Sequence, residues 1–343
     1  MNGINYSTHG TAVWRMGWRW VIPLVLVALH GPVSASIGTQ TDPSVLNAFA
    51  EVVAERHGLD DASLRRILQQ GRVQPGILRA MAQPATARPW YLYRPAVVDA
   101  RRIAAGARFW QAHAGTLERA AAAYGVPPEL IVATLGVETF YGRNTGGYRV
   151  LDALVTLAFH YPPRAELFRA ELEAFLLLVT ELGLDPFTIK GSFAGAIGIS
   201  QFLPSSYRQY AVDFNGDGRR DLWQVADAIG SVANYYRAFG WVTGGPVAAA
   251  AEVEGTEFRA LLGRGVKPDV TVARLRAVGV TPDLPSADDT LVTLLEIDTG
   301  AGPGYLAGFE NFYVITRYNR SVNYALSVHE LARELKRQRE AAR

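Results

Sequence analysis

Cysteine is absent from this chain of 343 residues. The chain therefore has no disulfide framework, no thiol nucleophile and no cysteine that could carry a lipid anchor. Histidine is also scarce, because the six histidines are scattered and none has a second one at metal-ligand spacing. No glycine motif that cradles a phosphate is present either. These absences argue against a zinc enzyme, a thiol enzyme and a nucleotide-binding enzyme.

The chain also lacks a marked excess of charge of either sign. It has 34 basic and 32 acidic residues, for a formal net charge of +2. No basic stripe with interleaved aromatic residues is present, so we expect no nucleic-acid partner. A hydrophobic content of 49% with 19% charged residues is typical of an ordered globular protein. The length predicts roughly two or three domains.

The apolar stretch near the N-terminus is short. Residues 20–29 are apolar, but spanning a bilayer takes about 20 residues. Arg15 and Arg19 precede this stretch, and the small residues 33–35 follow it. This order predicts a cleavable signal peptide over 1–35, with a retained single-span anchor as the alternative. Together with the missing cysteine, it predicts a periplasmic protein that is not a lipoprotein.

Hydrophobic periodicity predicts a mainly helical chain. We expect a loop over 84–95 and a break in one long helix near Gly106. The predicted helices cover residues 43–57, 63–70, 77–81, 96–124, 150–160, 164–182, 205–211, 226–240 and a closing helix from Ser321.

Strand-like segments appear only towards the C-terminal end. They lie at 251–254, 270–272, 291–297 and 311–315, with turn residues between them. The predicted fold class is therefore mainly α (α+β), with a helical core and a small β-containing insert. The predicted organisation is a signal peptide at 1–35, an N-terminal helical domain at 36–105, a catalytic core at 106–245, the β-containing insert at 246–314 and a C-terminal helix returning to the core at 315–343.

Glu138 is the residue most suited to catalysis. It follows the apolar, helix-like run 127–135, and Gly136 and Gly142 bracket the expected helix end. The negative end of a helix dipole and apolar neighbours both raise the pKa of a carboxyl group. A carboxylic acid that is still protonated near neutral pH can protonate a leaving glycosidic oxygen. The alternative is an ordinary solvated glutamate at a helix end.

One segment has the pattern of a cation-binding loop. Oxygen-bearing residues alternate from Asp213, and glycine stands at the sixth position, as in an EF-hand. Gln224 replaces the glutamate expected at the twelfth position, but Asp227 could supply the missing carboxylate in a longer loop. The candidate ligands for a structural Ca²⁺ or Na⁺ are Asp213, Asn215, Asp217, Arg219 and Asp227. An Asx-rich surface turn explains the same spacing equally well.

Several motifs occur together in a fixed order. They are Glu138 with its flanking glycines, then 148–154, 190–198, 201–207, the loop from Asp213, 229–235, 318–321 and Tyr324. This set closely resembles the B-type lytic murein transglycosylases of Gram-negative bacteria. The resemblance covers roughly residues 43 to 335 and is tightest from 126 to 241.

The resemblance implies a lysozyme-like helical core and cleavage of the β-1,4 bond between N-acetylmuramic acid and N-acetylglucosamine in peptidoglycan. The cleavage is non-hydrolytic and leaves a 1,6-anhydromuramic acid end. Glu138 would act first as general acid and then as base, helped by the substrate's acetamido group, so the chemistry would need no cofactor. The protein is expected to be a monomer that binds peptidoglycan glycan strands. Other cell-wall enzymes are candidate partners.

Other site residues follow by the same resemblance. Ser192 and Gln201 would hydrogen-bond sugars near the cleavage site. Groove residues, or residues that hold the glutamate, would be Tyr235, Tyr318, Asn319, Tyr324 and, as a weaker match, Tyr93. Two alternatives stay open at this point: a hydrolytic muramidase with the same glutamate, and a non-catalytic peptidoglycan-binding scaffold. The sequence does not distinguish endo from exo cleavage.

Overall fold

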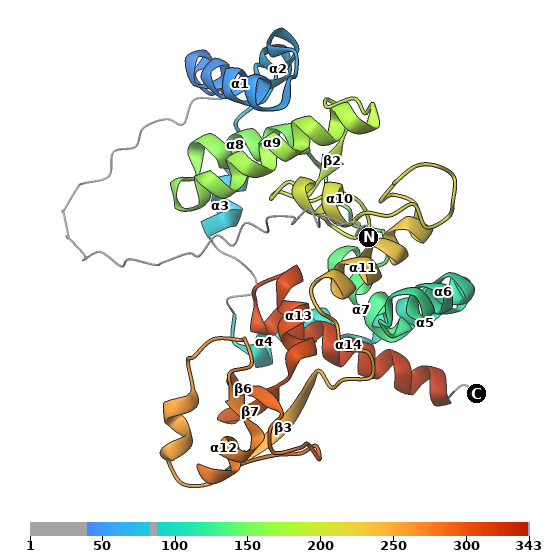
Figure 1. Ribbon diagram of the computed structural model, residues 1–343, viewed down its shortest axis with the longest axis vertical. Coiled ribbons are helices and arrows are strands. Elements are labelled where there is room, and N and C mark those ends of the chain that lie inside the picture. The colour runs from blue at the N-terminus through green and yellow to red at the C-terminus, as the bar shows by residue number, and fades with distance from the viewer. Residues whose placement is uncertain (1–39, 83–87, 342–343) are drawn as a thin grey trace, which may run out of the picture. The chain divides into compact units, whose positions relative to one another are not determined.

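The computed structural model describes residues 40–82 and 88–341. The predicted signal peptide lies outside these residues. Helices at nearly the predicted positions are α1 (Pro43–His57), α2 (Asp61–Leu68), α3 (Pro75–Ala82), α8 (Val150–His160), α9 (Ala165–Leu182), α10 (Pro204–Tyr210), α11 (Val225–Ala238) and α14 (Val322–Ala341). The mainly helical arrangement can be followed in Figure 1.

The predicted loop over 84–95 is partly wrong, because α4 (Trp90–Val97) begins inside it. Trp90 and Tyr93 lie three residues apart and are both buried. Residues at this spacing share one helix face, so α4 forms by packing that face on the core. Pro95 inside the helix obscured the pattern in the sequence.

The predicted long helix over 96–124 consists of two helices. The chain breaks between α5 (Ala100–Ala112) and α6 (Ala114–Tyr124) at His113, which has φ −120° and ψ 23°. Gly106, the predicted break, lies inside α5 and is buried. Its role is steric, as described below.

The strand predicted at 311–315 is also wrong. These residues belong to helix α13 (Glu310–Tyr318), in which Phe312 and Ile315 are buried on one face. The Asn311 side chain fixes the start of this helix by accepting from the Val242 N–H and donating to the Val242 carbonyl, each at 2.8 Å. A short, β-branched run bordered by turn residues does not reveal such a tertiary contact.

The β portion is one antiparallel sheet in the order β4-β6-β7-β3-β5. Its strands are β3 (Ala248–Val253), β4 (Val270–Thr271), β5 (Val280–Pro282), β6 (Leu291–Asp298) and β7 (Pro303–Gly308). Figure 1 shows helix α12 (Val272–Ala277) beside these strands. Buried residues of the strands and of α12 form a separate small core. Val292 and Leu294 of β6 enter this small core, whereas Leu295 joins the main core. Alternating side chains thus let one strand serve both cores.

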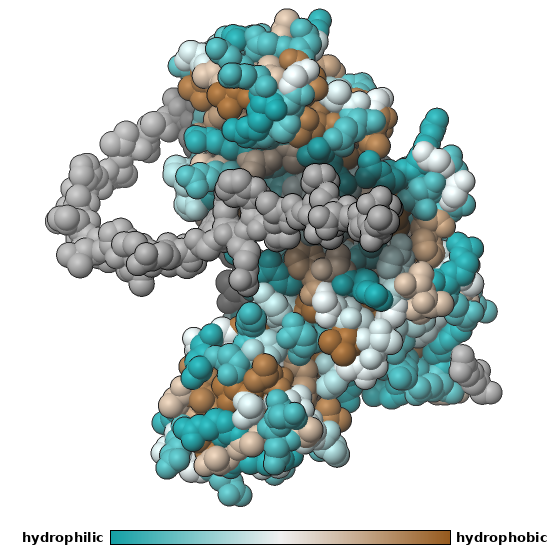
Figure 2. Space-filling model, viewed as in Figure 1, coloured by the Kyte–Doolittle hydropathy of each residue, from teal (hydrophilic) through white to brown (hydrophobic). Residues whose placement is uncertain are grey.

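The main core surrounds α7 (Pro128–Thr139), in which every residue from Leu130 to Gly136 is buried. Helices α5, α6, α11 and α14 all pack against α7, and α8 packs along α9. Hydrophilic residues cover most of the visible surface in Figure 2. Within the described chain no single helix is long and apolar enough to cross a membrane, although the bent pair α6 and α7 meets that test by length and composition.

The C-terminal end of α7 has an unusual backbone. Phe140 and Tyr141 adopt left-handed conformations with φ of 52° and 63°, and their N–H groups donate to the Gly136 and Leu135 carbonyls. Non-glycine residues rarely adopt this conformation, so surrounding contacts must hold it. Tyr141 supplies one such contact, because its hydroxyl donates to the Arg102 carbonyl at 3.0 Å.

Two glycines make room for the Tyr141 ring. A Cβ on Gly136 would lie 2.6 Å from the Tyr141 hydroxyl oxygen, and one on Gly106 would lie 2.3 Å from the same atom. These glycines therefore allow the tyrosine to lock the end of α7 against α5.

Gly136→Ala should lower the free energy of unfolding by about 1–3 kcal/mol, because the added methyl group overpacks this contact. The matched control is Gly115→Ala in α6, where an added Cβ meets nothing within 4 Å. We expect the control to be stabilised by about 0.5–1 kcal/mol through helix propensity. Urea denaturation measures both, and equal effects of the two substitutions would contradict the account of Tyr141.

Candidate active site

Glu138 lies one residue before the end of α7 and is half-buried. The hydroxyl of Tyr324, on α14, donates a hydrogen bond to Glu138 Oε1 at 2.6 Å. Tyr324 itself is only 3% exposed, so its ring has little freedom to move. The packing of α14 on α7 therefore holds the carboxyl group in place.

Burial raises the pKa of Glu138 to about 7, and the hydrogen bond from Tyr324 opposes part of that rise. Burial disfavours the charged form, whereas a hydrogen bond donated to the carboxylate favours it. Near neutral pH the group is therefore present in both protonation states, so it can both give and take a proton.

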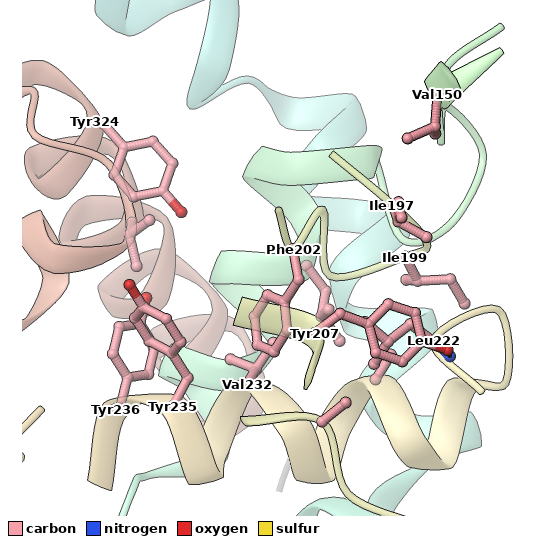
Figure 3. Close-up of a cluster of buried hydrophobic side chains, with 14 of the residues drawn as sticks. Val150, Ile197, Ile199, Phe202, Tyr207, Leu222, Val232, Tyr235, Tyr236 and Tyr324 are labelled. Carbon is pink, nitrogen blue, oxygen red and sulfur yellow. The ribbon is translucent and has the colours of Figure 1, made fainter. Parts of the chain in front are cut away.

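Five tyrosines surround Glu138. For each of them, burial is the largest cause of a raised pKa, and the charge of Glu138 adds to it. They are Tyr93 on α4, Tyr235 and Tyr236 on α11, Tyr318 at the end of α13 and Tyr324 on α14. In Figure 3 the hydroxyl ends of Tyr235 and Tyr236 point away from α11, towards the side that carries Tyr324. All of these tyrosines except Tyr236 were predicted as site residues from the sequence.

Hydrogen bonds to backbone carbonyls fix two of these phenols. The Tyr235 hydroxyl donates to the Arg317 carbonyl at 2.6 Å, and the Tyr318 hydroxyl donates to the Ser200 carbonyl. Tyr318 also stacks on Tyr324, with ring planes 16° apart. Tyr235, Tyr318 and Tyr324 are thus fixed by hydrogen bonds or ring stacking and do not move independently.

Tyr236 is the site residue that sequence reasoning missed. It is fully buried, and its hydroxyl lies 2.8 Å from Thr134 Oγ1, one helical turn before Glu138 on α7. Thr134 in turn donates to the Leu130 carbonyl, so Tyr236 is the donor to Thr134. The adjacent pair of tyrosines at 235 and 236 was the only signal in the sequence, and it does not show which ring faces the glutamate.

Ser192 and Gln201 belong to one folded loop. The strand β2 (Lys190–Gly191) pairs with β1 (Tyr148–Arg149), and the loop continues through bridges of Ile197 with Gly191 and Phe202. The Ser192 hydroxyl oxygen accepts N–H groups from Ala194 and Ala196. This leaves the hydroxyl proton of Ser192 for a partner outside the turn.

Gln201 is held in a strained, left-handed conformation with φ of 51°. Its side-chain nitrogen, Nε2, donates to the carbonyls of Thr145 and Gly198, at 3.0 and 2.9 Å. A strained backbone persists only where surrounding contacts hold it. The two hydrogen bonds are such contacts, and they also fix the orientation of the Gln201 side chain.

Two contacts tie this loop to the glutamate. The Thr139 hydroxyl, next to Glu138, donates to the Ile199 carbonyl at 2.8 Å. The Tyr318 hydroxyl binds the following carbonyl, that of Ser200. Two side-chain hydroxyls thereby hold the residues just before Gln201 at the end of α7.

Asn319 has a different setting from the tyrosines. It is exposed at the turn between α13 and α14, and its side-chain oxygen accepts from the Ser321 N–H at 3.2 Å. Ser321 Oγ in turn accepts from the Tyr324 N–H. The contacts of Asn319 therefore shape the turn that separates Tyr318 from Tyr324.

The predicted metal loop is an ordered turn. Asp213 accepts N–H groups from Gly216, Asp217 and Gly218, and Asp217 accepts from Arg219. Gly216 and Gly218 have positive φ, as a tight loop requires.

Asp227 joins this loop to α11. It is fully buried, and its carboxylate accepts N–H groups from Phe214, Asn215 and Asp221. Among residues 40–82 and 88–341, no group of three or more His, Asp or Glu side chains is arranged to hold a metal ion. The all-oxygen donor set suits a hard cation, and in this structure backbone N–H groups occupy the same oxygens.

The chain matches the family described as the Transglycosylase SLT domain over residues 42–333. It is 44% identical over 293 residues to membrane-bound lytic murein transglycosylase B of Escherichia coli K12, covering 82% of this chain and 80% of that protein.

Solved structures agree with this match. The soluble lytic transglycosylase SltB1 of Pseudomonas aeruginosa aligns with a TM-score of 0.81 and 46% identity, covering 86% of this chain and 99% of that one. The lytic transglycosylase Slt35 of E. coli in complex with calcium aligns with a TM-score of 0.79 and 42% identity, covering 89% and 95%. The predicted fold class, a lysozyme-like helical core with a small β portion, is thus confirmed.

The chain therefore belongs to the Transglycosylase SLT domain family. It is a lytic transglycosylase that acts on murein, as the motifs of the sequence predicted.

The raised pKa of Glu138 predicts a pH-dependent loss of stability. Its folded-state pKa of about 7 exceeds the ordinary value of 4.5. The stability that the neutral form contributes is complete below pH 4.5 and is lost as the pH rises through 7, at a cost on the order of 3 kcal/mol. Glu138→Gln removes this titration. Urea denaturation at about pH 4 and about pH 8 should therefore show a smaller fall for the variant than for the wild type. The same fall in both proteins would contradict burial as the cause.

Proposed function

We propose that Glu138 alone performs the acid and base steps of a non-hydrolytic cleavage. The bond is the β-1,4 link between N-acetylmuramic acid and N-acetylglucosamine in peptidoglycan. The observation that supports this most strongly is the half-buried Glu138, whose pKa burial raises to about 7 and whose carboxyl group accepts a hydrogen bond from the Tyr324 hydroxyl. Such a group is protonated often enough to act as acid and basic enough to act as base.

In the first step the protonated Glu138 gives its proton to the bridging oxygen. The bond between that oxygen and the muramic anomeric carbon breaks, and the N-acetylglucosamine end leaves as an alcohol. The substrate's acetamido group stabilises the cationic carbon. Substrate assistance of this kind replaces the second carboxylate that most glycosidases use.

In the second step the Glu138 carboxylate takes the proton of the muramic 6-hydroxyl. The oxygen of that hydroxyl attacks the anomeric carbon of the same sugar, which closes the 1,6-anhydro ring and restores the protonated glutamate. No water is consumed. Attack from within one sugar gains from proximity, and the hydrogen bond from Tyr324 stabilises the carboxylate between the two steps.

The neighbouring residues are proposed to bind the glycan. Ser192 keeps a free hydroxyl proton, and Gln201 of the same loop has its side chain fixed by hydrogen bonds, which suits hydrogen bonds to sugars. Tyr93, Tyr235 and Tyr318 would line the glycan-binding groove or hold Glu138 in place. Asn319 would shape the edge of that groove.

A related protein supports this substrate class. SltB3 of P. aeruginosa, 32% identical with a TM-score of 0.75, has been solved with NAG-NAM-pentapeptide. We infer that this chain likewise acts on peptide-bearing glycan strands.

The cellular setting is proposed from the sequence. A signal peptide at 1–35 would direct the protein to the periplasm, where it would act as a soluble monomer. One relative is named membrane-bound and another soluble, and the absence of cysteine favours the soluble form here. The domain limits at 36–105, 106–245, 246–314 and 315–343 likewise stay predictions.

We also propose that the loop at 213–227 binds a structural calcium ion. Slt35 of E. coli has been solved with calcium. In this chain Asp213, Asn215, Asp217 and Asp227 would supply side-chain oxygens, and Arg219 its carbonyl. The ion would tie the loop to α11, which carries two of the site tyrosines.

Glu138→Gln should lower the release of soluble muropeptides from purified sacculi by at least about 100-fold, because it removes the proton donor and acceptor. Pelleting with sacculi should show unchanged binding. The control is Glu129→Gln at the start of the same helix, which we expect to keep full turnover. Substantial turnover by Glu138→Gln would rule out the assignment.

Asp217→Ala should lower the melting temperature roughly 2–4 °C more in calcium than in chelator, because the lost ligand weakens ion binding to the folded state. Asp298→Ala is a matched control. Both aspartates accept the N–H two residues ahead in an exposed turn, but Asp298 lies outside the loop. Calorimetric scans in both conditions measure the shifts, and equal losses for Asp217→Ala in calcium and in chelator would remove the calcium proposal.

A further inference from the structure

A hollow lies beside the end of α7. It has a volume of about 640 Å³ and lies between α5, with the residues just before it, and the segment 140–144. Its charged and aromatic lining consists of Asp99, Arg101, Arg102, Arg108, Arg143 and Phe140. We call it the basic cavity.

The basic cavity holds far more positive than negative charge. Its one carboxylate, Asp99, lies 3.5 Å from Arg102 and 4.0 Å from Arg101. Within the part of the chain that the structure describes, neither Arg108 nor Arg143 forms an ion pair with a carboxylate. In a chain whose total charge is nearly balanced, this is a local concentration of guanidinium groups that suits an anionic ligand.

Part of this lining is rigid. Arg102 donates to the carbonyls of Gly136 and Ala96, at 3.1 and 3.0 Å, and is mostly buried. The guanidinium carbons of Arg102 and Arg143 lie 5.3 and 5.5 Å from the centre of the Phe140 ring. Phe140 therefore holds two arginines by cation–π contacts, which places their charge reproducibly.

The basic cavity adjoins the catalytic glutamate. Phe140 follows Glu138 by two residues, and Arg102 binds a carbonyl of the same helix end. The pKa of Tyr93 is raised by burial and by Glu138 and lowered by Arg102, so this tyrosine lies within electrostatic reach of both groups. On the other side, the Thr145 carbonyl, next to Asn144 of the cavity, accepts from Gln201.

We propose that the basic cavity binds carboxylates of the stem peptide that murein carries on its muramic acid. This rests on the proposed function, because it places the peptide of a glycan strand whose sugar is cleaved at Glu138. The sugars of an intact strand are uncharged, whereas the peptide bears several carboxylates. Arginine forks bind carboxylates with two parallel hydrogen bonds, so Arg108 and Arg143 are the residues that select a charged peptide.

The test compares two soluble NAG-NAM-NAG-NAM-peptide substrates. One has free peptide carboxylates, and the other has them converted to carboxamides. The wild type should prefer the carboxylate substrate by about tenfold in kcat/KM, as two partly exposed ion pairs allow. The double variant Arg108→Gln, Arg143→Gln should lose this preference while keeping its rate on the carboxamide substrate. Arg274→Gln, an exposed arginine of α12 outside the cavity, should keep the preference.

The same comparison of binding in the Glu138→Gln background separates the two claims. If Glu138→Gln binds the carboxylate substrate more tightly than the carboxamide substrate, that difference does not depend on turnover. A failure of the cleavage mechanism would therefore leave the result for the cavity intact. The proposal is overturned if the wild type binds and cleaves both substrates equally well. It is also overturned if the double variant keeps the preference or loses activity equally on both substrates.

Discussion

The structure depends on one interaction, the burial of the Glu138 carboxyl group at the end of an apolar helix with Tyr324 as its hydrogen-bond donor. Burial alone would keep the group neutral, and the phenol lowers the cost of its charged form. Helix α14 must pack on α7 to bring this phenol into place, and α13 precedes it with Tyr318. The proposed chemistry is therefore built on a contact between two segments that lie far apart in the chain.

The loop that carries Ser192 and Gln201 is attached to the same helix end. The Thr139 hydroxyl and the Tyr318 hydroxyl bind consecutive carbonyls of this loop. The same set of contacts thus positions the proposed acid, the tyrosines around it and the candidate sugar-binding groups. These contacts also hold the strained backbones of Gln201, Phe140 and Tyr141. Arg102 connects this helix end to the basic cavity, because it lines the cavity and donates to the Gly136 carbonyl of α7.

The sequence predicted most helices and four of the five tyrosines, because apolar periodicity and ordered motifs are local signals. It did not predict α13, whose start depends on the contact of Asn311 with Val242. Tyr236 was missed because neighbouring tyrosines do not reveal which ring faces inward. Gly106 was read as a helix break, although it makes room for Tyr141. The basic cavity was not predicted either, since Arg108 and Arg143 come to line one hollow only after folding.

The most direct test of the account is mass spectrometry of the muropeptides that the protein releases from purified sacculi. A glutamate that serves as acid and then as base to the muramic 6-hydroxyl predicts products lighter by one water molecule than hydrolytic ones, without a reducible muramic end. Products with reducible ends would show that water attacks, which contradicts the intramolecular step. Binding without release would contradict the catalytic role of Glu138 itself.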